Sequence, residues 1–129
     1  MTDERPALEE LQSRLGQTEP IFAVFMETTD KYQGANTPEG REMLRRHYVY
    51  LFDLQDRGIL LAGGPLDLDK PPAGGIIVIR APSRAEAEAI AYNETYHVAG
   101  WRVNRVRSLV LRFGSLIGPV QKLLETPTT

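Results

Sequence analysis

Two short runs of this sequence are apolar at successive positions, and they restrict the folds that the chain can form. Residues 21–26 (IFAVFM) and 75–79 (GIIVI) are rich in β-branched and aromatic side chains, which favour strands. Successive side chains of a strand point to opposite faces of its sheet, so both faces of these strands are apolar. We therefore expect a sheet that must be covered on both sides.

Two helices are expected between the strands. Thr37 and Pro38 supply an N-cap and a first-turn proline for one helix, which should end at Gly58. Ser83, with a Glu three residues later, forms a capping box that predicts a second helix, ending near Asn93.

Two further strands are expected at residues 59–62 and 103–113. Gly63, Gly64 and Pro65 should end the first of them in a tight turn, because proline cannot continue a central ladder. The resulting order, β-α-β-β-α-β, is that of the ferredoxin-like α+β fold, in which both helices lie on one face of the sheet.

A chain of 129 residues has room for one domain and leaves the second face of such a sheet bare. Because that face is apolar here, we expect a second copy of the chain to cover it. The sequence therefore predicts a homodimer in which two sheets pack face to face as a dimeric α+β barrel.

The chain is expected to divide into three parts. Residues 1–20 form an N-terminal helical extension, whose Leu8, Leu11 and Leu15 share one stripe and should pack on the main body. Residues 21–113 form the α+β domain. Residues 114–129 form a C-terminal helix over residues 117–124, followed by a frayed tail.

Composition excludes several classes of site. The chain has no Cys and two His, which excludes thiolate chemistry and makes a metal site unexpected. No glycine-rich nucleotide or phosphate motif occurs, so we expect no cofactor. The N-terminus shows no signal peptide, and no apolar run approaches the ~20 residues that span a bilayer, so we expect a cytoplasmic protein without a membrane partner.

The net charge of −2 argues against nucleic acid as a partner. It conceals an uneven distribution: residues 1–73 hold 13 acidic and 8 basic residues, and residues 74–129 hold 4 and 7. Four of the later bases are Arg102, Arg105, Arg107 and Arg112. They form either a solvated, charged strand or a pocket wall that attracts an anionic small molecule.

His47 stands out within the first helix. It shares a stripe with Leu44, Leu51 and Leu54, at intervals of three, four and three residues. A histidine on an apolar helix face is either a buried core residue or a group held ready for acid/base chemistry, because imidazole titrates nearest to neutral pH.

Three stretches together resemble the YCII-related family, which belongs to the dimeric α+β barrel group. They are His47 followed by GILLAGGP at residues 58–65, AGGIIVI at residues 73–79 with the capped helix after it, and NETYHVAG at residues 93–100. The last stretch is similar to an Asp-Pro-(aromatic)-x-x-Ala-Gly segment of the family, although Glu94-Thr95 replaces Asp-Pro. The resemblance covers about residues 21–113.

The resemblance implies an active site with a histidine and an acidic residue, which are His47 and Glu94 in this chain. A carboxylate that contacts one ring nitrogen fixes the tautomer of the imidazole and raises its basicity. Such a pair can remove a proton next to a carbonyl or move one in an isomerisation or elimination.

Further residues are candidates for binding a substrate. Gly64 and Pro65 shape the backbone beside the expected pocket, Arg102 would attract an anion, and His97 would form a second polar wall. Tyr96 is either a wall of the pocket or part of the core.

Two hypotheses follow from the sequence. In the first, the protein is a cofactor-free lyase or isomerase that uses His47 and Glu94 in a cleft of a homodimer. In the second, it is a non-catalytic dimeric module that binds a small ligand or another protein.

Overall fold

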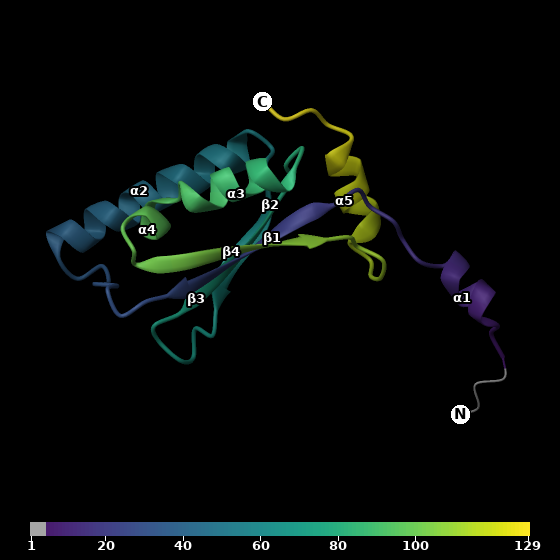
Figure 1. The fold of residues 1–129 in the computed structure, drawn as a ribbon, viewed down its shortest axis with the longest axis horizontal. Coiled ribbons are helices and arrows are strands. Elements are labelled where there is room, and N and C mark those ends of the chain that lie inside the picture. Colours follow the sequence, from purple (N-terminus) through teal and green to yellow (C-terminus); the bar gives the residue numbers. More distant parts are fainter. Residues whose placement is uncertain (1–4) are drawn as a thin grey trace.

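A four-stranded antiparallel sheet forms the centre of the computed structural model, which describes residues 5–129 (Figure 1). Its strands are β1 (Ile21–Thr28), β2 (Leu60–Leu66), β3 (Gly74–Ile79) and β4 (Arg102–Leu109). Their order is β2-β3-β1-β4, so the two runs that are apolar on both faces lie in the central strands. This order confirms the predicted ferredoxin-like α+β fold.

Two helices, α2 (Pro38–Asp56) and α3 (Arg84–Tyr92), cover one face of the sheet (Figure 1). The predicted caps are present: the side chains of Thr37 and Ser83 accept hydrogen bonds from backbone N–H groups in the first turns of α2 and α3. Gly58 follows α2 and has a φ of 76°, a left-handed conformation that favours glycine. This conformation terminates the helix.

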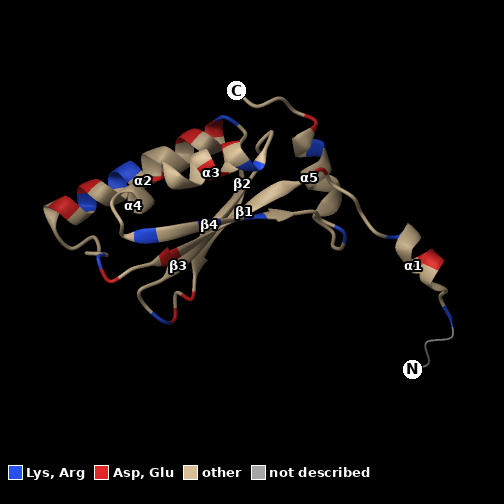
Figure 2. Ribbon diagram, in the orientation of Figure 1, with Lys and Arg blue, Asp and Glu red and all other residues tan. Residues whose placement is uncertain are grey.

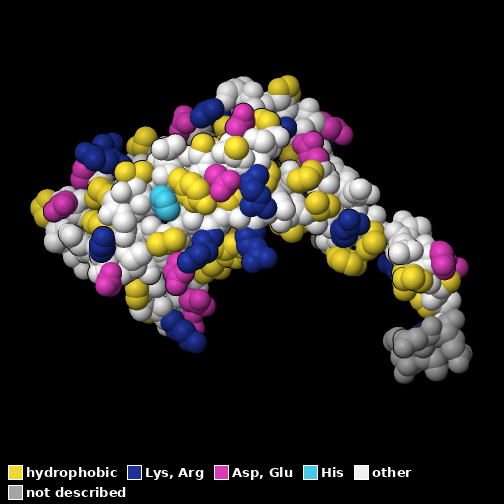
Figure 3. Space-filling model, viewed as in Figure 1, with side chains coloured by type: hydrophobic (Ala, Val, Ile, Leu, Met, Phe, Trp, Pro, Cys, Tyr) yellow, Lys and Arg dark blue, Asp and Glu magenta, His cyan; other side chains and the backbone are white. Residues whose placement is uncertain are grey.

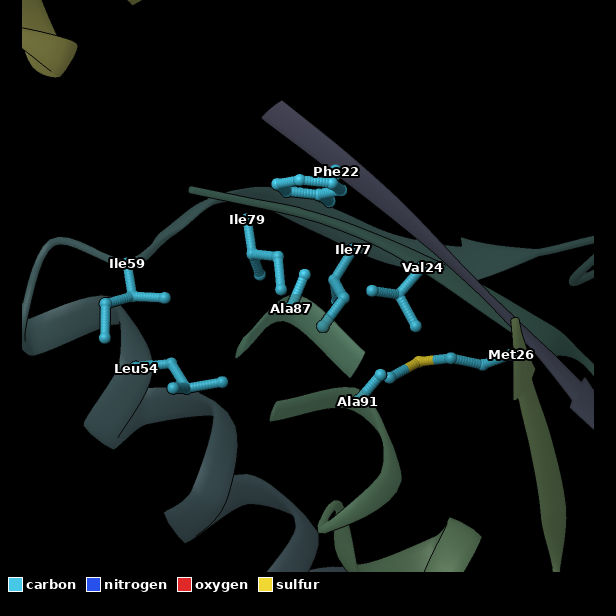
Figure 4. Packing of buried hydrophobic residues seen from close by; sticks show 9 residues of the cluster. All are labelled: Phe22, Val24, Met26, Leu54, Ile59, Ile77, Ile79, Ala87 and Ala91. Atoms are coloured by element: carbon cyan, nitrogen blue, oxygen red, sulfur yellow. The ribbon is translucent and has the colours of Figure 1, made fainter. Parts of the chain in front are cut away.

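The hydrophobic core lies between this face and the helices (Figure 4). Strands β1 and β3 contribute alternate side chains, and α3 contributes two alanines that are fully buried. The small alanine side chains let the helix approach the sheet closely. The cluster consists of Phe22, Val24, Met26, Leu54, Ile59, Ile77, Ile79, Ala87 and Ala91.

The opposite face of the sheet has no helix over it in Figure 1. Phe25 lies between the buried Val24 and Met26 of β1, points to this open face and is 41% exposed. Its neighbours across the ladders are Ile76 of β3 and Arg105 of β4. Ile21 and Ala23 on the same face are buried, whereas Phe25 and its neighbours Ile76 and Val78 are only partly covered. This part of the face meets the condition that predicted a dimer.

The predicted turn at Gly63-Gly64-Pro65 is wrong. These residues belong to β2, where Gly64 pairs with Ile76 and Pro65 pairs with Gly75. The prediction assumed a central strand, but β2 lies at the sheet edge, where a proline that lacks an N–H can face outward without losing a ladder hydrogen bond.

Strand β4 is shorter than predicted, because it ends at Leu109 and not near residue 113. The residues that follow pair with the N-terminal segment: the backbone N–H of Leu111 donates to Oγ1 of Thr18, and that of Gly16 donates to the carbonyl of Arg112.

The N-terminal helix α1 (Leu8–Ser13) contains no buried residue and projects from the body of the chain (Figure 1). Leu8 is 63% exposed and Leu11 is 42% exposed, so the prediction that the stripe packs on the main body is wrong for a single chain. Residues 1–4 of the predicted extension lie outside the described range.

The C-terminal helix α5 (Ile117–Leu124) lies where it was predicted, but the tail is not frayed. The guanidinium of Arg80 donates to carbonyls of Leu123, Leu124 and Thr126. Arg57 and Thr129 exchange a backbone hydrogen bond and a side-chain hydrogen bond. Over residues 5–129, no helix is both long and apolar enough to cross a membrane.

The contact between α3 and the sheet leads to a stability prediction. Ala87→Leu should lower the free energy of unfolding by about 1–3 kcal/mol, because the added atoms have no space beside the sheet. Ala89→Leu on the exposed side of the same helix is the control and should change it by less than about 0.5 kcal/mol. Chemical denaturation measures both values, and equal effects would contradict the packing described here.

Candidate active site

Helix α2 carries His47 into the interior of the protein. The imidazole lies on the helix side that faces the sheet and α4 (Thr95–Val98), and the residue is only 7% exposed. The apolar stripe that singled out His47 in the sequence is the reason for this burial, because an amphipathic helix turns that stripe to the core.

Glu94 approaches His47 from the start of α4. It is the N-cap of this short helix, and its Oε2 accepts a hydrogen bond of 2.6 Å from the backbone N–H of Tyr96. The same oxygen lies 3.2 Å from Nδ1 of His47. The two atoms are at ion-pair distance but are not aligned as a hydrogen bond, and Oε1 of Glu94 has no partner in the described chain.

The structure therefore brings together the two residues that the sequence resemblance selected, although they are far apart in the chain. Glu94 is 1% exposed, so its carboxylate lies behind the imidazole and away from solvent. A buried carboxylate oxygen without a partner is costly unless a nearby group can donate to it. The imidazole of His47 is the ionisable group beside this carboxylate.

Tyr96 stacks on the imidazole of His47, with ring centroids 4.3 Å apart and planes inclined by 5°. Tyr32 and Trp101 pack against the other parts of its ring. Burial raises the pKa of Tyr96 to about 12, because the phenolate would lose its solvation, and the nearby phenol of Tyr32 contributes. The Tyr96 hydroxyl is therefore protonated at neutral pH and available as a hydrogen-bond donor.

Arg102 lies near the same ring. Its Cζ is 5.2 Å from the centroid of Tyr96, and Nη1 lies 3.8 Å from Sδ of Met26. Nε is buried and has no hydrogen-bond partner among residues 5–129.

These groups border a cleft of about 580 Å³ between α2 and the β2–β3 edge of the sheet. Of the residues predicted for a site, the cleft is lined by His47, Gly64, Pro65, Tyr96 and Arg102, while Glu94 supports His47 from behind. The volume is within the range of small-molecule sites. Within the described chain, no three His, Asp, Glu or Cys side chains gather as a metal site would require.

His97 does not line this cleft. Adjacent residues of a helix point about 100° apart, so the turn that directs Tyr96 inward directs His97 toward β4. There its Nδ1 accepts a hydrogen bond of 3.1 Å from the backbone N–H of Asn104, and its ring stacks on Tyr92. Arg84 donates to the carbonyl of Val106 nearby. The side chains of His97 and Arg84 therefore both form hydrogen bonds with backbone groups of β4, an edge strand whose outer side has no neighbouring strand.

The four arginines of the predicted basic segment do not form one wall. Strand β4 carries three of them (Figure 2), but alternation directs Arg102 to the helix side and directs Arg105 and Arg107 to the other. The last two lie in a separate open groove with His97 and Arg84, and Figure 3 shows basic side chains gathered below the helices on this face. Arg112 lies beyond β4.

The sequence analysis missed several residues that line the cleft. Tyr48, Phe52 and Gln55 follow Leu44 at helical intervals and form the rim on α2, while Tyr32 and Leu68 come from loops. The helical spacing of residues 44, 48, 52 and 55 is a signal that could have identified the rim on α2. No comparable pattern marks a loop residue.

The buried phenol predicts a pH effect. The folded chain holds the Tyr96 proton up to about pH 12, whereas an unfolded tyrosine loses it near 10, so this stabilising contribution is complete below pH 10 and disappears between the two values. Tyr96→Phe should therefore lose less stability than the wild type between about pH 9 and about pH 11. Chemical denaturation at both pH values measures the free energy of unfolding of the wild type, of Tyr96→Phe and of the exposed control Tyr48→Phe. An equal loss of stability in the wild type and in Tyr96→Phe would contradict the prediction.

Comparison with known proteins places this architecture. The model of the YCII-related domain matches residues 21–109. The structure is similar to 5-chloro-2-hydroxyhydroquinone dehydrochlorinase (TftG) from Burkholderia phenoliruptrix AC1100, solved in complex with 2,5-dihydroxybenzoquinone. The TM-score is 0.52 at 19% identity, over 67% of this chain and 90% of that one. No curated protein matches the sequence. Because the family match spans more than half of the chain, the protein belongs to the YCII-related domain family.

Proposed function

We propose that this protein is a small-molecule enzyme of the lyase or isomerase type, in which His47 transfers a proton and Glu94 positions His47. The observation that carries the proposal is the 3.2 Å approach of Glu94 Oε2 to His47 Nδ1 beside a cleft of small-molecule size. A buried carboxylate lowers the stability of a fold. In this proposal the buried carboxylate of Glu94 serves to position the imidazole of His47.

The proposed mechanism uses the two nitrogens of His47 differently. A carboxylate beside Nδ1 favours the tautomer that carries its proton there, which leaves Nε2 as the base. Nε2 takes a proton from a carbon next to a carbonyl, and the imidazolium that forms is stabilised by Glu94. The proton then returns to a different atom in an isomerisation, or the electron pair expels a leaving group in an elimination.

The structural neighbour supports this reaction type. Its name describes a dehydrochlorinase, and removal of hydrogen chloride is an elimination. Its structure holds a small organic molecule, 2,5-dihydroxybenzoquinone. We include chlorinated hydroquinones and small carbonyl compounds in the set of substrates to be tested.

A homodimer is part of the proposal. The open face of the sheet presents Phe25 beside Ile76 and Val78, and a second copy would remove these side chains from water. Arg105 and Glu27 on the same face can meet opposite charges of the partner.

The dimer is tested by replacing the central aromatic of the open face. The wild type should be a dimer by light scattering at micromolar concentration, and Phe25→Glu should be a monomer, because an unpaired carboxylate would be buried in the interface. Phe113→Glu, which changes an 80% exposed residue outside the sheet, is the control and should remain a dimer. A monomeric wild type would contradict the proposal.

The catalytic roles are tested by turnover. Reactions in deuterium oxide, followed by proton NMR, detect exchange or elimination in the substrate set. His47→Gln should lower the rate by about 10²–10⁴-fold, since that is the usual contribution of a general acid/base, and Glu94→Gln should also lower it. His97→Gln, the other histidine, lies outside the cleft and should leave the rate unchanged.

Melting temperatures of the three variants show whether each is folded. Turnover that survives in folded His47→Gln would contradict the mechanism. Ligand binding with no turnover of any compound would favour the hypothesis of a non-catalytic binding module.

A further inference from the structure

The guanidinium of Arg102 is a charge in the cleft that no carboxylate of the described chain neutralises. No Asp or Glu of residues 5–129 lies within ion-pair distance of it. Its neighbours are the sulfur of Met26 and the ring of Tyr96, which are weak partners for a cation, and its Nε is buried without an acceptor.

Such a group needs an anion. The residue is half-buried, and its buried Nε is a donor without an acceptor, which is unfavourable. A charge-assisted pair with a carboxylate would use this donor. Gly75 lines the cleft next to this group: a Cβ there would lie 3.5 Å from Nη1 of Arg102, so glycine places no side chain against the guanidinium. Glu94 is not this anion in the structure, because among residues 5–129 its carboxylate forms no ion pair with Arg102.

The remainder of the cleft is mostly apolar or aromatic. Leu44, Leu51 and Phe52 line the α2 side, and Ile76 lies on the sheet side. A ligand that fits both features has one charged group for Arg102 and a compact apolar body for these walls.

We propose that Arg102 is the anion-binding residue of this cleft and that its ligand is a small, singly charged organic acid with a compact apolar body. This inference uses the cleft of the proposed function but does not require turnover. His47 and Arg102 line the same cleft, so an acid held by Arg102 would share that cleft with His47.

The test compares benzoate with benzamide, which have nearly the same shape but differ in charge. Isothermal titration and thermal shift should detect benzoate binding to the wild type, whereas benzamide should bind at least about tenfold more weakly, because a hydrogen bond to a charged group is worth more than a neutral one.

The variant comparison assigns the effect to one residue. Arg102→Gln should weaken benzoate binding by about 10- to 100-fold. Arg102→Lys retains the charge without the planar fork and should retain part of the affinity. Arg112→Gln is the control, since Arg112 is exposed, lies beyond β4 and does not line the cleft, and the variant should bind benzoate as the wild type does.

Three results would overturn the inference: no benzoate binding to the wild type, equal binding of benzamide, or equal weakening by Arg112→Gln. The first two need no variant, so the inference remains testable if Arg102→Gln does not fold. His47→Gln separates the two proposals, because it should abolish turnover and retain benzoate binding. Benzoate binding through Arg102 without any turnover would leave the anion site standing and remove the enzymatic function.

Discussion

The candidate site depends on one carboxylate oxygen. Oε2 of Glu94 caps α4 by accepting the backbone N–H of Tyr96, and it lies against Nδ1 of His47 on α2. The cap fixes where α4 begins, and α4 in turn directs Tyr96 inward to stack on the imidazole. One buried interaction thus joins two helices and fixes the positions of the His47 imidazole and the Tyr96 ring. Without it, His47 would be buried with no ionisable partner beside it.

The sheet forms the other side of the cleft, and its two faces differ. Helices cover one face, and the cleft opens between α2 and the β2–β3 edge. Glycine at positions 63, 64, 74 and 75 keeps this edge free of side chains, and in two cases a side chain would collide with the neighbouring strand: Gly63 with Ile77 and Gly74 with the carbonyl of Met26. The open face is the one that the proposed homodimer would cover.

Two kinds of charged group lie next to Tyr96. One is the buried pair of Glu94 and His47, and the other is Arg102, which is permanently charged and has no carboxylate partner in the described chain. The two proposals together describe a cleft in which Arg102 would hold a small acid and His47 would move one of its protons.

The sequence by itself determined the local structure: the caps at Thr37 and Ser83, the end of α2 at Gly58, the central strands and the burial of His47 all follow from short-range patterns. The family resemblance added Glu94 as its partner. Only the tertiary structure decided that β2 is an edge strand, that His97 faces β4 and that Arg102 alone of its segment enters the cleft. These outcomes depend on strand order and on the direction of one side chain relative to distant elements, and local periodicity contains no information about either.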